Sequence, residues 1–277
     1  DESGARPGTP RRPRSPLPPV VRVLAAVGVG FLVLPLLALV VRAPWGDLVP
    51  LLTRPESLAA LRLSLLTATS AAALCVIVWV PLALVLARGS GRAVALVRAL
   101  VVVPLVLPPV VGGVALLLAY GRRGLLGAPV DAATGWSLPF STPAVIVAEA
   151  FVALPFLVIA VEAALRGADP RMGQVAATLG ASRGVVLRRV TLPAVAPALV
   201  AGTVLCWARA LGEFGATVTF AGSLPGTTRV LPTEVVVALE TDPAAAAALG
   251  LLLLAVCVVV LVLLRARWLS PLVAGRP

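Results

Sequence analysis

The chain has 277 residues, of which 60% are hydrophobic and 13% are charged. Soluble globular domains carry about 45–50% apolar and roughly 25% charged residues, so this composition favours a membrane protein. The formal net charge is +11, and every basic residue is Arg because the sequence has no Lys. The absence of His and Lys excludes metal and haem sites that depend on imidazole, catalytic triads with a His base, and a phosphate-binding loop that ends in Lys.

Three cysteines, Cys75, Cys206 and Cys257, each lie in a different apolar stretch. Thiols in such positions usually pack as small hydrophobic side chains. Their separation supports neither a disulfide framework nor a zinc site. We therefore expect no metal site, no cofactor and no catalytic residue in this chain, so any ATP that its work consumes must be bound by another protein.

Six apolar stretches follow residues 1–19, a Pro- and Arg-rich segment that has too little apolar surface to fold and is predicted to be a disordered tail. Each stretch is long enough to cross a bilayer, which takes about 20 apolar residues. The sequence thus predicts an all-α membrane domain over 20–264 and a second tail over 265–277. The predicted spans are 20–41, 61–87, 99–119, 143–164, 194–216 and 244–264.

The arginines between the spans predict the orientation of the chain. If the N-terminus is cytoplasmic, sixteen arginines lie on the cytoplasmic side, one (Arg209) lies within a span, and six lie outside: Arg42, Arg54, Arg62, Arg122, Arg123 and Arg229. Basic residues are enriched in cytoplasmic loops, so we expect both termini in the cytoplasm. The positive charge is then explained by topology, and we expect no nucleic-acid partner.

The connection at 165–193 contains a predicted helix that begins after Asp169, with Pro170 in its first position, and stops at Gly180. Ser182 is expected to cap a second short helix that leads into the fifth span. An apolar face on the first helix suits a groove on another protein, or equally a position on the lipid surface. The residues of this face are Met172, Val175, Ala176 and Leu179.

One pattern in this connection resembles a known signature. The pattern consists of Gln174-Val175-Ala176, then Gly180 after three residues, then Val190-Thr191-Leu192-Pro193 after nine more. It is similar to the EAA motif of ABC-importer permeases. Gln174 stands where many members carry Glu. The resemblance implies six transmembrane helices of the type I importer fold, with a cytoplasmic coupling helix between helices 4 and 5 that sits in a cleft of an ATPase. The implied coupling residues are Asp169, Met172, Gln174, Val175, Ala176, Leu179, Gly180, Leu192 and Pro193.

Residues 104–113, 120–127 and 210–232 resemble segments of molybdate permeases, within an overall resemblance over roughly 55–265. This branch implies import of molybdate or tungstate across the bacterial cytoplasmic membrane. It also implies a homodimer with the pathway at its axis, two copies of an ATPase that holds ATP and Mg, and an extracytoplasmic binding protein. A sulfate or thiosulfate permease is the alternative, because sulfate permeases are related.

Pro104, Pro108 and Pro109 remove backbone donors from the middle of the third span, and Gly112 and Gly113 permit close helix packing. Such prolines bend or unwind a helix, either as a packing kink or where freed carbonyls face protein or a water-filled cavity. We expect the bent third helix to form a wall of the gate together with the fifth.

Arg209 and Glu213 are four residues apart and are expected to pair on one helical face. One interpretation is a self-neutralising pair. The other is that Arg209 attracts an oxyanion on the pathway while Glu213 holds its geometry, because charged residues inside a membrane usually have a function. Weak hydroxyl contacts to the anion are then expected from Thr217, Thr219 and Ser223.

Arg122 and Arg123 follow the third span. They are either solvated loop charges or functional residues, which would pair with acidic residues of the binding protein or attract the anion. Glu149 in the fourth span has no evident partner in the sequence, and its role stays open. An ion-coupled transporter would need several buried acids, a His relay or internal repeats. A membrane enzyme would need a cluster of catalytic groups or metal ligands. Neither pattern is present in the sequence.

Overall fold

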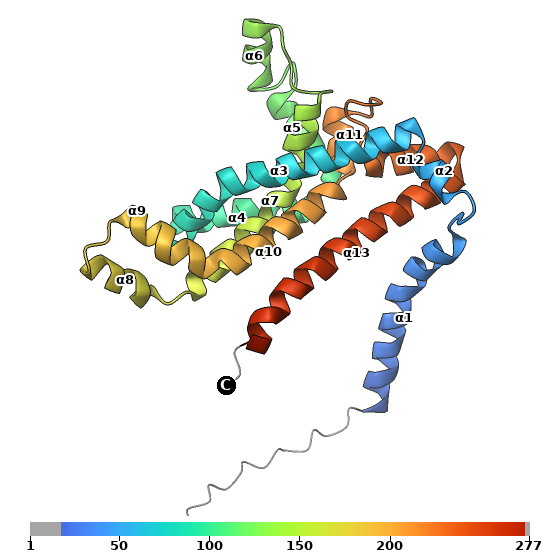
Figure 1. Ribbon diagram of the computed structural model, residues 1–277. Helices are drawn as coiled ribbons and strands as arrows, with labels where there is room; N and C mark the ends of the chain where they lie inside the picture. Colours follow the sequence, from blue (N-terminus) through green and yellow to red (C-terminus); the bar gives the residue numbers. More distant parts are fainter. Residues whose placement is uncertain (1–17, 275–277) are drawn as a thin grey trace, which may run out of the picture. The chain divides into compact units, whose positions relative to one another are not determined.

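The computed structural model describes residues 18–274, and all regular structure in that range is helical (Figure 1). Apart from its last two residues, the predicted tail at 1–19 lies outside the described residues, as do residues 275–277 of the second predicted tail. The last helix, α13 (Pro243–Ala274), extends through most of that second tail. Among the described residues, five helices are long and apolar enough to cross a membrane, and a sixth crossing results if the bent pair α4–α5 counts as one span.

Helix α1 (Pro19–Arg42) belongs to a compact unit separate from the rest of the chain, which begins at Ala43. None of its residues is buried, and apolar side chains such as Phe31 and Leu34 are exposed on all sides of the helix. A helix that is apolar all round is typical of a membrane-spanning segment. The prediction of a span at 20–41 is confirmed.

The second unit is built around three long helices, α3 (Pro55–Arg88), α7 (Thr142–Gly167) and α10 (Leu192–Leu211). Small residues dominate their contacts, as is typical of helices that pack closely in a membrane. At Gly202 of α10, an added Cβ would lie 3.0 Å from the Cβ of Ala160, so the two backbones are close there. Fully buried members of this core are Ala68, Ala71, Cys75, Ala83, Ala153, Leu157, Val158, Cys206 and Ala210.

The predicted third span is divided into α4 (Arg92–Val106) and α5 (Pro109–Tyr120), whose axes differ by 119°. Leu107 and Pro108 both adopt extended backbone, each with ψ of 131°. Each of them precedes a proline, and the residue before a proline is disfavoured in the helical region. The bend expected within 99–119 is therefore a complete break of the helix between Val106 and Pro109.

The connection at 165–193 forms α8 (Pro170–Thr178), α9 (Arg183–Val186) and a π-helical turn (Leu187–Thr191) that continues into α10 without interruption. Figure 1 shows α8 and α9 at one end of the second unit, with α6 (Gly127–Thr134) and α12 (Leu231–Thr241) toward the other. α2 (Leu48–Leu52) packs against α13 and α3.

The fifth span predicted at 194–216 was wrong at its end, because α10 stops at Leu211 and α11 (Gly215–Ala221) is a separate short helix. Residues 212–214 connect the two helices, and Gly212 has left the helical conformation with ψ of 8°. α11 packs mainly against α5 and α7. The division therefore places the end of the fifth span beside the broken third span.

Candidate translocation and coupling sites

Helix α8 is defined by the local signals expected from the sequence. The Asp169 Oδ1 accepts a hydrogen bond from the Arg171 N–H at 2.9 Å, and Pro170 occupies the first turn. At the other end Gly180 has φ of +82°, a conformation that favours glycine and ends the helix. The predicted N-cap and stop are confirmed. Ser182 does precede α9, but its side chain makes no capping hydrogen bond, so that part of the prediction was wrong.

The apolar face of α8 is open in this chain. Met172 is 64% exposed, Val175 57% and Leu179 83%, whereas Ala176 is half-buried. Gln174 is also exposed and forms no side-chain hydrogen bond with another described residue. Leu192 and Pro193 form the first turn of α10. The structure thus separates an open apolar face on α8 from the Leu-Pro pair that begins the next long helix.

Contact between α5 and α11 depends on glycine. A Cβ added to Gly113 would lie 2.7 Å from Thr219 Cβ and 2.8 Å from the Ala216 carbonyl oxygen. A Cβ added to Gly215 of α11 would likewise lie 2.9 Å from Pro109 Cβ. The two backbones therefore touch directly, and the broken third span lies against the segment that follows the fifth.

The other predicted residues of the third span occupy different environments. Gly112 faces α7, where an added Cβ would lie 3.2 Å from the ring of Phe151. Pro104 is buried inside α4, whereas Pro108 and Pro109 are exposed at the break. The structure therefore brings Gly112, Pro108 and Pro109 together on the α5 side of the break and leaves Pro104 within the helix before it.

Arg209 and Glu213 form the expected ion pair, with 2.6 Å between Arg209 Nη2 and Glu213 Oε2. Glu213 lies beyond the end of α10 and not on its face, because the helix ends at Leu211. A turn bond from the Glu213 N–H to the Ala210 carbonyl, at 3.0 Å, keeps the carboxylate within reach of Arg209. The Glu213 side chain is buried (1% exposed), whereas 28% of the Arg209 side chain is exposed.

The three hydroxyls expected to line a pathway have different partners. Thr217 is fully buried, and its Oγ1 has no hydrogen-bond partner among the described residues. Thr219 donates to the Gly215 carbonyl oxygen at 2.8 Å. Ser223 Oγ accepts from Arg229 Nε at 3.1 Å. Only Thr217 therefore keeps a hydroxyl free of protein partners.

Glu149, whose role the sequence left open, receives a hydrogen bond from Thr67 Oγ1 to its Oε1 at 2.9 Å. Both residues are fully buried, and Glu149 Oε2 has no partner among the described residues. The two residues are 82 positions apart, so no local pattern connects them. A polar Thr67 within an apolar helix indicates that its hydroxyl needs a partner, but nothing in the sequence identifies Glu149 as that partner.

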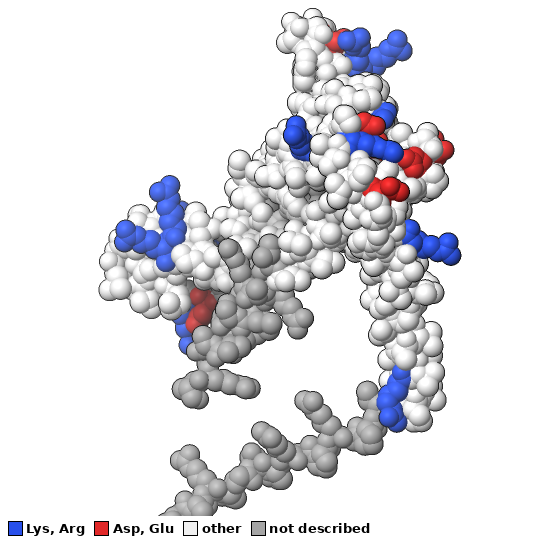
Figure 2. Space-filling model, turned by 45° about the vertical axis from the view of Figure 1, so that its right-hand side comes forward, with Lys and Arg blue, Asp and Glu red and all other residues white. Residues whose placement is uncertain are grey.

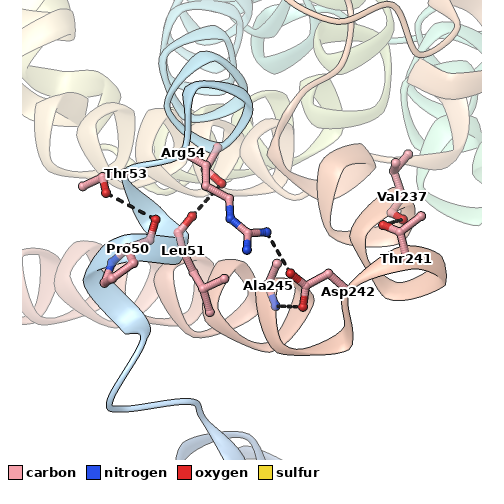
Figure 3. A network of polar contacts seen from close by, with 9 residues as sticks. Pro50, Leu51, Thr53, Arg54, Val237, Thr241, Asp242 and Ala245 are labelled. Atoms are coloured by element: carbon pink, nitrogen blue, oxygen red, sulfur yellow. Dashed lines mark hydrogen bonds and ion pairs between the residues drawn. The ribbon is translucent and has the colours of Figure 1, made fainter.

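Ion pairs also join residues at the end of the unit that contains α6 and α12. Arg122 Nε lies 3.3 Å from Asp131 Oδ1 in the same connection, whereas Arg123 forms no ion pair with a described residue. Figure 3 shows Arg54 Nη1 bound to Asp242 Oδ2 at 2.8 Å, with the Ala245 N–H donating to the same carboxylate. These hydrogen bonds, that from Arg54 first, lower the pKa of Asp242 below its ordinary value. No pattern in the sequence predicts the Arg54–Asp242 pair, because its members are 188 positions apart.

Charged side chains are unevenly distributed over the second unit. On the face drawn in Figure 2 they gather at the α8–α9 end and at the end with α6 and α12, and the surface between is largely uncharged. An uncharged band between two charged ends is typical of a protein that crosses a bilayer.

Comparison with known proteins agrees with this arrangement. Residues 79–273 match the family described as binding-protein-dependent transport system inner membrane component. The chain is 52% identical over 234 residues to the molybdenum transport system permease protein ModB of Mycobacterium tuberculosis, which covers 84% of this chain and 88% of that protein. It is 38% identical over 176 residues to the protein of the same name from Escherichia coli strain K12, covering 64% of this chain and 77% of that protein.

A crystal structure of a bacterial alginate ABC transporter, in complex with an alginate pentasaccharide-bound periplasmic protein, has the same fold. The TM-score is 0.71 at 17% sequence identity, over 88% of this chain and 91% of that chain. The resemblance to ABC-importer permeases and the all-α fold are confirmed. The chain is therefore a multi-pass inner membrane protein and a transport component, and it belongs to the family of binding-protein-dependent transport system inner membrane components.

Proposed function

We propose that this chain is the permease subunit of an ATP-driven importer that carries molybdate across the cytoplasmic membrane. The observation that carries the proposal is the 52% identity, over most of both chains, to a protein named as a molybdenum transport permease. The subunit acts as a homodimer with the pathway at its axis. Two copies of a separate cytoplasmic ATPase bind ATP and Mg, and an extracytoplasmic binding protein delivers the anion. Arg123 is a docking residue for that binding protein, because Asp131 pairs with Arg122 and not with Arg123.

The coupling role of α8 is supported by its open apolar face and by its connection to α10. Gly173 of α8 lies against Val186 of α9, with 3.6 Å between an added Cβ and Val186 Cγ1, and α9 runs through the π-helical turn directly into α10. A displacement of α8 by the ATPase therefore moves a continuous helix that ends near Arg209. ATP-driven closure of the two ATPases brings the two copies of α8 together and opens the gate outward, and hydrolysis resets it.

The pathway role of Arg209 is supported by its partial exposure. Its side chain keeps 28% of its surface accessible, although Glu213 neutralises it from the buried side. A guanidinium held in this way attracts an oxyanion without binding it so tightly that the anion is trapped. The contact of Gly113 with Ala216 and Thr219 joins this segment to the broken third span, which forms the wall of the gate.

The cytoplasmic position of α8 and of both termini is supported by the distribution of arginine. Sixteen arginines, including those of the α7–α10 connection, lie on the side that this orientation makes cytoplasmic. The opposite orientation would place them outside, against the usual preference.

Uptake of labelled molybdate into vesicles that contain this chain with its ATPase and binding protein tests the proposal. We expect ATP-dependent uptake that excess tungstate suppresses and excess sulfate leaves largely unchanged. A matched preparation that lacks only this chain gives the background. Suppression by sulfate, together with ATP-dependent sulfate uptake, would contradict the proposal and assign the chain to sulfate transport.

A further inference from the structure

A hollow of about 820 Å³ lies between α8 and the ends of the membrane helices, outside the proposed pathway, and Met172 of the apolar face of α8 is among its lining residues. Its walls come from the last turns of α3 and α7, from α8, from the π-helical turn and from the first turn of α10. Three arginines, Arg88, Arg166 and Arg189, line it together with a single carboxylate, that of Asp169. Figure 2 shows basic side chains gathered at this end of the unit.

The positive charge of the hollow is not balanced within the described residues. The side chains of Arg88 and Arg189 form no hydrogen bond or ion pair with another described residue. Arg166 lies 3.8 Å from Glu162, but that carboxylate already accepts a 2.7 Å hydrogen bond from Arg98. The Asp169 carboxylate is engaged in capping α8. The hollow therefore has an excess of guanidinium groups without acidic partners.

The remaining lining of the hollow is mainly apolar, so the site is basic on one part of its surface and hydrophobic on the rest. It is also formed at the ends of membrane-spanning helices, on the side that the arginines mark as cytoplasmic. Basic pockets between helices on this side suit the head groups of anionic lipids, whose acyl chains continue along apolar walls. The apolar lining residues include Leu165, Met172, Val186 and Val190.

We propose that this hollow binds a tetrahedral oxyanion group through Arg88 and Arg189, and that the phosphodiester of an anionic phospholipid supplies it. The apolar walls favour a lipid over a free anion, although a free oxyanion offers the same chemistry. The bound group bridges the end of α3 and the π-helical turn, so it holds the base of α8 against the ends of the membrane helices. The inference does not depend on which anion the protein transports.

Native mass spectrometry of the full chain tests the proposal, after release from nanodiscs of phosphatidylcholine with or without phosphatidylglycerol. We expect the wild type to retain one phosphatidylglycerol per chain. The double variant Arg88→Gln/Arg189→Gln should bind it about thirtyfold more weakly, because each of the two arginines near an anionic head group contributes about a fivefold factor. The matched control Arg92→Gln/Arg183→Gln removes the same charge outside the hollow and should retain the lipid.

A second experiment distinguishes the two sources of the anion. Equilibrium dialysis of the chain in lipid-free micelles against molybdate and inorganic phosphate should show no binding that depends on Arg88 and Arg189. Such binding, without retention of phosphatidylglycerol, would keep the oxyanion site but assign it to a free anion. The variant Arg88→Lys/Arg189→Lys keeps the charge and should restore much of the binding if the glutamine variant is poorly folded.

Three results would overturn the proposal. The first is equal lipid retention by the hollow variant and its matched control, and the second is no binding in either experiment. The third is loss of ATPase co-purification in Arg88→Gln/Arg189→Gln with lipid retention unchanged, since the hollow would then be part of the protein interface. Both experiments measure binding and not transport, so a negative result would not contradict the proposed role in molybdate import.

Discussion

Arg209 Nη2 lies 2.6 Å from Glu213 Oε2, and the second oxygen of the same carboxylate accepts the Ala216 N–H at 2.8 Å. Glu213 thus connects the end of α10 to the start of α11 through its two oxygens. Because α11 touches α5 at Gly113, this one carboxylate links the fifth span to the broken third span. The pair therefore positions the proposed gate as well as neutralising a charge.

Replacing Arg209 by Ala should lower both stability and molybdate uptake. The buried Glu213 carboxylate would lose its counter-ion, and removing one partner of a buried pair costs about 3–5 kcal/mol. The partial exposure of Arg209 places the expected loss at or below the low end of that range. Thermal unfolding in micelles and uptake in vesicles measure the two effects, and the ATPase should still co-purify.

The double variant Arg209→Gln/Glu213→Gln separates a structural pair from a functional arginine. It removes both charges together, so the free energy of unfolding should recover toward that of the wild type. If Arg209 attracts the transported anion, uptake stays low in spite of that recovery. Uptake that recovers together with stability would show that the pair is only structural.

Replacing Gly113 by Ala should separate α5 from α11. The new Cβ would lie 2.8 Å from a backbone oxygen of Ala216, which cannot move as a side chain can, and overpacking of this kind costs about 1–3 kcal/mol. Gly112→Ala should cost less, because its neighbour is the ring of Phe151. Gly184→Ala, with nothing within 4 Å, is the control. Equal unfolding temperatures for all three variants would contradict the close contact.

Replacing Thr67 by Val should destabilise the protein through Glu149. The Glu149 Oε1 would lose its donor at a fully buried position, and an unsatisfied buried polar group costs about 1–3 kcal/mol. Thr67→Ser keeps the hydroxyl and should stay close to the wild type. Chemical unfolding in micelles measures the difference, and a serine variant as unstable as the valine variant would point to packing of the methyl group instead.

Replacing Val175 by Asp should weaken ATPase binding without unfolding the permease. Val175 is 57% exposed on the apolar face of α8, so the change removes little internal packing but places a charge in the proposed interface. We expect at least about a tenfold loss of co-purified ATPase, as one buried unpaired charge easily exceeds 1.4 kcal/mol. Ala177→Asp introduces the same charge on the opposite side of α8 and should bind normally. Equal loss in both variants would argue against the assigned face.

The Arg54–Asp242 pair predicts a dependence of stability on pH. Because the pKa of Asp242 is lowered in the folded protein, its carboxylate stabilises the fold above the unfolded pKa of about 3.9, and that contribution is lost as the pH falls through the folded value. The gap in unfolding temperature between wild type and Asp242→Asn should be constant from about pH 7 to 5 and narrow below about pH 4. If the difference in unfolding temperature did not change at acid pH, the charge of the Asp242 carboxylate would not contribute to stability.

Features that depend on neighbouring residues along the chain could be predicted from the sequence. Long apolar runs predicted the membrane spans. A segment in lipid must satisfy its backbone hydrogen bonds within itself, so each run forms a helix. Asp169 and Gly180 predicted the ends of α8, because capping acts within one turn. The prolines at 108 and 109 predicted a bend for the same local reason, although its size of 119° depends on how α5 packs.

Contacts between residues far apart in the sequence could not be predicted in this way. Thr67 reaches Glu149 across 82 positions, and Arg54 reaches Asp242 across 188. The end of α10 at Leu211 depends on packing, because the contacts of Gly113 and Gly215 fix α11 as a separate helix. The hollow with Arg88 and Arg189 exists because the ends of α3 and α7 meet α8 and the π-helical turn that leads into α10. Contacts of this kind arise from packing and electrostatics between helices, and no spacing along the chain encodes them.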